Sequence, residues 1–227
     1  MDTLIAAAAT FVAGHFVLAA QPVRVALIDR LGENGFRILF SLVALVTLVW
    51  TIKAWADAPY HALWVPPIWA AHVPLVVMPF AAILVVAGQT TPNATSIGGE
   101  RVAEGRHPAP GIMSITRHPV LCGVTLWALS HLAVNGGAAD LVLFGGLIVL
   151  AVGGMIHIDR RRQATLDSGW GPIALTTSAV PFLAALQGRC RIDWAGIGLW
   201  RPALGVALYF VLLWAHAPVI GVSPLPA

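Results

Sequence analysis

The chain has 227 residues, of which 58% are hydrophobic and only 10% are charged, and its formal net charge is +3. A soluble domain of this size carries about 25% charged residues. The low charge and a mean hydropathy of +0.82 exclude a soluble enzyme, a disordered regulator and a DNA-binding domain. They predict instead that lipid surrounds most of the protein surface.

Six apolar segments are long enough to cross a bilayer, whose hydrocarbon core of about 30 Å needs roughly 20 helical residues. In chain order they are residues 3–20, 36–53, 66–88, 119–136, 139–158 and 197–216. A seventh apolar stretch, residues 172–186, is short and contains Pro181, so we expect it to lie at the membrane interface. The sequence predicts an all-α polytopic transmembrane helix bundle, with six spans and one interfacial helix, that forms a single domain over residues 1–227.

Positive charges fall on one side of these spans. With the N-terminus outside, twelve of the thirteen Lys and Arg residues lie on the inner side, and only Lys53 lies outside. Because positively charged loops remain in the cytoplasm, this pattern predicts the orientation of a multi-pass membrane protein. We expect its location to be a bacterial inner (plasma) membrane. The polar segment 89–116 is expected to be an irregular cytoplasmic loop.

Two of the eight histidines are predicted to lie deep in the membrane. His15 and His131 each follow the start of their span by twelve residues, and the two spans run in opposite directions. At 1.5 Å per residue, each lies about 18 Å from its own face, near the middle of a core of about 30 Å. Two such imidazoles suit a bis-histidine haem or another metal inside a bundle. Two interhelical hydrogen bonds would explain them equally well.

The residues around His131 are compatible with a flat cofactor. Gly123, Trp127 and His131 recur at every fourth position, so a gap, an aromatic ring and an imidazole share one helix face. Inner-side arginines such as Arg117 could pair with haem propionates, although topology alone explains them. Asp159, beside three arginines, is expected to be an ion-pair partner. The sequence has no Cys-x-x-Cys, so covalent c-type haem and a Cys-rich zinc site have no support.

Short motifs extend from the first span to the loop before the last. They are Gly14-His15 followed by Arg24, Leu31–Phe40 (LGENGFRILF), Gly111–Pro119 (GIMSITRHP), Gly123 with Trp127 and His131, Asp159-Arg160-Arg161, and Thr177–Arg189 (TSAVPFLAALQGR). Together these motifs resemble the NnrU family of integral membrane proteins, which includes the plastid 15-cis-zeta-carotene isomerase.

This resemblance implies a polytopic protein that, in the isomerase branch, binds haem b through two histidines. By motif these ligands fall on His15 and His131, the same pair that depth selects. With Trp127, Arg117 and His118 they form the predicted cofactor-binding set.

Two kinds of function follow from the resemblance. One is a link to denitrification, through nitrite and nitric oxide reduction; the other is haem-dependent cis–trans isomerisation of a lipophilic polyene. The expected partners are the lipid bilayer and either a lipophilic substrate or a membrane reductase, with no nucleic acid. The isomerase branch carries another histidine soon after its second span, where this chain has Ala56 and Ala58 and only nearby His61. We therefore assign no role that needs a third histidine.

Two alternatives remain open on the sequence alone. The segment Arg117–Gly123 also resembles isoprenylcysteine-type membrane methyltransferases, in which a His-Pro turn and later acidic residues hold S-adenosylmethionine. In that comparison the expected tyrosine is Leu121, and the expected glutamate pair is replaced by Asp159-Arg160. The other alternative is a non-catalytic assembly partner of a membrane reductase, with His118 and the arginine loops as its docking face.

Overall fold

The computed structural model describes residues 1–95 and 110–226, so Arg101 and Arg106 of the inner loop lie outside the described residues. The long helices are α1 (Asp2–Ala19), α2 (Gln21–Ala56), α3 (His72–Thr90), α5 (Pro119–Val134), α6 (Ala138–Leu166) and α10 (Trp200–Ile220). The shorter elements are α7 (Trp170–Thr176), α8 (Leu183–Leu186), α9 (Trp194–Ile197) and the 3-10 turns η1 (Ile68–Ala71), η2 (Gly111–Ser114) and η3 (Asp167–Gly169). Within the described ranges, the only β-type pairing is an isolated bridge between Ala62 and Gly137.

The predicted all-α bundle is confirmed. Within residues 1–95 and 110–226, five helices are long and apolar enough to cross a membrane, so the chain is a multi-pass membrane protein. The remaining predicted span, residues 119–136, corresponds to α5, which has 16 residues and a length of about 24 Å. The largest difference from the predicted bounds is in α2, which begins at Gln21 rather than at residue 36.

A glycine explains this early start. Gly32 has φ 71° and ψ 167°, a conformation that residues with a Cβ rarely adopt. The chain therefore turns at Gly32 between a polar first segment of α2, which carries Arg24 and Arg30, and the apolar segment that follows. The apolar pattern detected only the second segment, because the first is too polar to count as a span.

The segment 172–186 does not form a spanning helix. It contributes to α7, with 7 residues, and α8, with 4 residues. These lengths correspond to about 10 Å and 6 Å of helix, far less than a hydrocarbon core of about 30 Å. The expectation that this stretch stays out of the membrane core is consistent with these two short helices.

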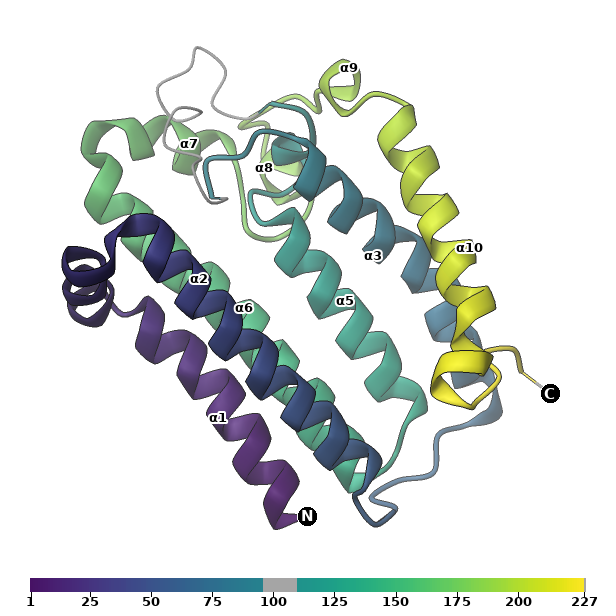
Figure 1. The fold of residues 1–227 in the computed structure, drawn as a ribbon. Coiled ribbons are helices and arrows are strands. Elements are labelled where there is room, and N and C mark those ends of the chain that lie inside the picture. Colours follow the sequence, from purple (N-terminus) through teal and green to yellow (C-terminus); the bar gives the residue numbers. More distant parts are fainter. Residues whose placement is uncertain (96–109, 227) are drawn as a thin grey trace.

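The long helices pack in a row (Figure 1): α1 and α2 lie beside α6, α6 beside α5, α5 beside α3, and α3 beside α10. The inner-side loops and the short helices α7, α8 and α9 gather at one end of the bundle, at the top of Figure 1. The described arginines belong to the segments at this end, whereas Lys53 lies near the opposite end of α2. The arrangement agrees with the predicted sorting of charge.

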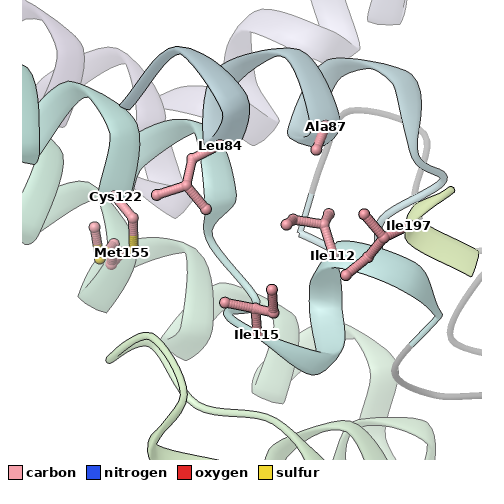
Figure 2. Close-up of a cluster of buried hydrophobic side chains, with 7 residues drawn as sticks. All are labelled: Leu84, Ala87, Ile112, Ile115, Cys122, Met155 and Ile197. Atoms are coloured by element: carbon pink, nitrogen blue, oxygen red, sulfur yellow. The ribbon is translucent and has the colours of Figure 1, made fainter. Parts of the chain in front are cut away.

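A buried cluster joins the arginine-rich end to the helices beneath it. Figure 2 shows its side chains turned toward one another between α3, α5, α6, η2 and α9; they are Leu84, Ala87, Ile112, Ile115, Cys122, Met155 and Ile197. Each is at most 9% exposed. The cluster fixes the loop that leads into α5, and with it the position of the Arg117-His118 pair.

Small residues allow the closest helix contacts. A Cβ added at Gly123 would lie 2.7 Å from Val85 Cγ2 and 2.8 Å from the Ala81 carbonyl oxygen. Gly123 therefore lets α5 approach α3, as small residues do in membrane interfaces. The gap that the sequence assigned to a cofactor at Gly123 is filled by α3, which corrects that interpretation.

We expect Gly123→Ala to lower the free energy of unfolding by about 1–3 kcal/mol, the usual cost of overpacking. The added methyl group would meet a backbone carbonyl, which cannot rotate away. Thermal unfolding in detergent micelles measures the effect. Gly171→Ala is the control, because no atom lies within 4 Å of its added Cβ; equal stability of the two variants would contradict the close contact of α3 with α5.

Candidate functional site

His15 lies on α1 and faces α2. Its Nδ1 donates a hydrogen bond to the Phe11 carbonyl oxygen at 2.7 Å. Its ring contacts the rings of Phe11 and Phe40, with centroid distances of 4.6 Å and 5.3 Å. The imidazole is thus held in one orientation by a backbone acceptor and two aromatic neighbours.

His131 has a similar environment on α5. Its Nδ1 donates to the Trp127 carbonyl oxygen at 2.9 Å. The ring centroids of Trp127 and Phe144 lie 5.6 Å and 5.4 Å from its own. The structure therefore brings together His131 and Trp127, both of which belong to the predicted set.

The two histidines present the same chemical group. A hydrogen bond to a carbonyl requires a proton on Nδ1, so the neutral ring of each keeps its lone pair on Nε2. Among the described hydrogen bonds none involves Nε2 of His15 or of His131. Metal-binding histidines have this arrangement, in which a backbone carbonyl fixes the tautomer while the other nitrogen binds the metal.

The two helices that carry these histidines stand on opposite sides of α6. A Cβ added at Gly146 would meet Val12 of α1 at 3.6 Å, whereas Phe144 faces α5. Two consecutive helical steps rotate by about 200°, so these positions point in nearly opposite directions. Leu150 and Gly154 lie on the α6 face between them, and both line a cavity.

The depths of the two imidazoles can be compared along α6. His131 lies beside Phe144, and His15 lies just before Phe16, whose ring covers Gly153. Their Cα atoms therefore differ in height by about eight residues of α6, or about 12 Å. Each ring leans toward the N-terminus of its helix, and α1 and α5 run in opposite directions, so the two rings lean toward a common level.

The cavity between these helices has a volume of about 980 Å³. Its deeper part is mostly apolar and includes His15, Phe16, Phe36, Phe40, Val120, Leu121 and Leu150. Its inner end is polar and includes Arg24, Glu33, Arg37, Gln89, Asn93, His157, Arg161 and Arg162. His118 also lines it, whereas His131 lies outside its wall.

These observations allow a test of whether the residues fit a bis-histidine haem. The donor set fits, because two imidazoles whose Nε2 atoms have no described hydrogen bond lie on opposite sides of α6 and lean toward each other in height. The described contacts do not join His15 to His131; the imidazole nearest to His131 is that of His216 on α10, at a centroid distance of 6.5 Å. His216 was not among the predicted site residues, because residue 216 is the last position of the predicted span 197–216. In the structure α10 continues past it to Ile220.

Arg117 and His118 belong to a separate polar cluster at the inner end. Arg117 donates to Asp159 from Nε at 2.9 Å and from Nη2 at 2.7 Å, and His118 Nε2 donates to Asp159 Oδ1 at 2.7 Å. Arg117 also donates to the Thr177 carbonyl oxygen at 3.3 Å. The expectation that Asp159 is an ion-pair partner is confirmed, although its partner is Arg117 rather than the adjacent arginines.

Of the inner-side arginines that the sequence offered for haem propionates, Arg24, Arg161 and Arg162 line the cavity and Arg117 does not. Arg117 directs its donors toward Asp159 and Thr177. Arg37 also lines the cavity. Arg37 belongs to the LGENGFRILF motif. That motif was the one feature of the sequence that could have indicated Arg37 as a site residue.

Comparisons with known proteins identify relatives of this chain. A family model described as NnrU protein matches residues 3–224. The chain is 28% identical over 164 residues to "15-cis-zeta-carotene isomerase, chloroplastic" of Zea mays, a match that covers 71% of this chain and 44% of that protein. It is 28% identical over 162 residues to the protein of the same name from Arabidopsis thaliana, covering 70% of this chain and 44% of the relative. The matched region is therefore less than half the length of these relatives, and no solved structure matches the chain.

Proposed function

The chain belongs to the NnrU family, and from this premise we propose that it binds one haem b between His15 and His131 and isomerises a cis double bond of a lipophilic polyene. The observation that carries this proposal is that the two imidazoles make the same hydrogen bond. Each donates Nδ1–H to the carbonyl four residues earlier, and each keeps Nε2 available.

Haem b bound there would supply an iron centre that can act as a Lewis acid toward a conjugated double bond. The chain provides the surroundings. The carbonyl groups of Phe11 and Trp127 hold the imidazoles in one tautomer, and the rings of Phe40 and Phe144 keep water away from them. A dry and shaped site is what a protein contributes to cofactor chemistry.

The choice of a polyene rests on the relatives and on the cavity. Both curated relatives are isomerases of a carotene, by name. The deeper cavity wall is formed by aromatic and aliphatic side chains, among them Phe36, Phe40 and Leu150. Such a wall suits an apolar chain that enters from the bilayer.

Conversion of 15-cis-zeta-carotene in the dark tests this function. We expect the haem-loaded protein in lipid vesicles to change the cis-to-trans ratio at the central double bond, measured by chromatography, under reducing conditions. Haem-free protein is the control and should leave the ratio unchanged. Lack of conversion by protein that carries one haem per chain would reject the isomerase activity and leave haem binding to be judged on its own.

The remaining expectations are predictions that neither the site nor the relatives test. They are the link to nitrite and nitric oxide reduction, the membrane reductase as a partner, S-adenosylmethionine-dependent methyl transfer and the bacterial inner membrane as the location. The Asp159 carboxylate is bonded to Arg117 and His118, and this bonding is a structural role that needs no S-adenosylmethionine.

A further inference from the structure

The inner end of the cavity holds an arginine pair that a hydrocarbon substrate does not need. Arg24 and Arg37 both line the cavity. Both donate to the same oxygen of Glu33, Oε1, at 3.2 Å and 3.1 Å. One carboxylate therefore serves two guanidinium groups, which leaves one positive charge in excess within this triad.

The geometry of the triad leaves it open to an incoming anion. The side chains of Arg24, Glu33 and Arg37 are 24%, 50% and 42% exposed. Each guanidinium has five N–H donors in a planar fork, and the hydrogen bonds to Glu33 use one from each. The remaining N–H groups can donate to the oxygens of a carboxylate or phosphate, which arginine binds with two parallel hydrogen bonds.

An apolar wall begins directly beyond the triad. The Arg24 guanidinium lies 5.4 Å from the centre of the Phe36 ring, and Phe40 follows one turn deeper, in contact with His15. From Glu33 to Phe40 the helix rises about 10 Å. Along α2 the cavity wall is thus cationic at its inner end and apolar deeper in the membrane.

From this arrangement we infer that the cavity binds an anionic amphiphile, with its carboxylate or phosphate on Arg24 and Arg37 and its apolar part along Phe36 and Phe40. The anionic group can come from the propionates of a porphyrin or from the head of a lipid. Glu33 competes with that group for the two arginines. The inference is independent of iron ligation and of isomerase activity.

Two pairs of probes with equal apolar parts test it. The first pair is metal-free protoporphyrin IX and its dimethyl ester, followed by porphyrin fluorescence. The second pair is oleate and oleyl alcohol, followed as radiolabelled ligands. Because the porphyrin lacks iron, failure of the histidine ligands does not affect the result. The full chain, purified without haem in detergent micelles, is compared with Glu33→Gln and Arg37→Gln.

We expect Arg37→Gln to weaken binding of an acidic probe by roughly three- to tenfold and Glu33→Gln to strengthen it by a similar factor, given partly exposed charge-assisted contacts. The neutral probes should be unaffected by either change. Tighter binding to Glu33→Gln cannot result from misfolding. Arg30→Gln is the matched control, because Arg30 is an exposed arginine of the same helix, α2, and does not line the cavity.

The two probe pairs also identify the source of the anion. A response of protoporphyrin IX alone supports porphyrin propionates, a response of oleate alone supports a lipid head, and a response of both supports a site for either. Equal affinities of the acidic and neutral probes for the unmodified chain would overturn the inference. Weaker acidic binding to Glu33→Gln would overturn it as well.

Discussion

The His131→Ala variant is expected to purify with less than about a tenth of a haem per chain, against about one in the unmodified protein, since a lost ligand costs more than the 10–100-fold of a second-shell change. The reason is that His131 would supply one of two nitrogen ligands, and the aromatic residues beside it offer no replacement. Haem content is measured by converting the bound haem to its pyridine complex and reading the absorbance.

The neighbouring histidine provides the control for this experiment. His216 lies 6.5 Å from His131, ring centre to ring centre, and its Nδ1 donates to the Val222 carbonyl oxygen at 2.8 Å. Under our proposal His216→Ala keeps its haem. Full haem in His131→Ala, combined with loss in His216→Ala, would mean that α10 rather than α5 supplies the ligand.

The Asp159→Asn variant is expected to lower the free energy of unfolding by about 2–3 kcal/mol, because breaking this partly buried ion pair leaves the Arg117 guanidinium without its charged acceptor. The side chains of Arg117 and His118 are 16% and 1% exposed. The amide oxygen of asparagine can still accept hydrogen bonds, but its NH₂ group is itself a donor and would face the N–H donors of Arg117 or His118. The expected fall in the midpoint of thermal unfolding is about 5–12 °C for a chain of this length.

Asp29→Asn is the matched control for Asp159. Asp29 is exposed on the first segment of α2, so its loss of charge should move the midpoint by no more than about 1 °C. If Asp159→Asn is equally stable, the three-residue cluster does not hold the arginine-rich end together. In that case the hydrophobic cluster around Ile112 and Ile197 must carry this role alone.

The sequence predicted the parts of the fold that depend on local composition. Apolar runs indicated the spans, because lipid requires them wherever a helix crosses. The predicted start was least accurate for α2. Its segment from Gln21 to Leu31 carries three charged residues, and the turn at Gly32 is made by its backbone conformation. A residue type alone does not reveal such a conformation.

The spacing of residues along the sequence could not predict contacts between distant segments. Arg117 and Asp159 are separated by 42 positions, and their pairing follows from the packing of α5 on α6. The approach of His216 to His131 depends on where α10 lies relative to α5, which no spacing encodes. Gly123 was assigned to a cofactor face because helical periodicity identifies a shared face but does not say which neighbour occupies it.

The depth of the two candidate ligands, unlike the contacts between segments, could be estimated from the sequence. Counting residues from the span starts placed His15 and His131 near one level, since the rise of a helix is fixed. Comparison along α6 gives Cα atoms about 12 Å apart in height, with rings that lean toward each other. The estimate of depth was useful because a membrane helix has a known length and direction. Depth does not identify the group that the two histidines bind.

Electron paramagnetic resonance of the oxidised protein tests the pairing of His15 and His131 most directly. If both imidazoles bind one iron, the unmodified protein gives a low-spin signal typical of two nitrogen ligands, and this signal is absent from both His15→Ala and His131→Ala while His216→Ala retains it. A low-spin signal that persists in either His15→Ala or His131→Ala, at full haem content, would contradict the pairing on which the proposed function rests.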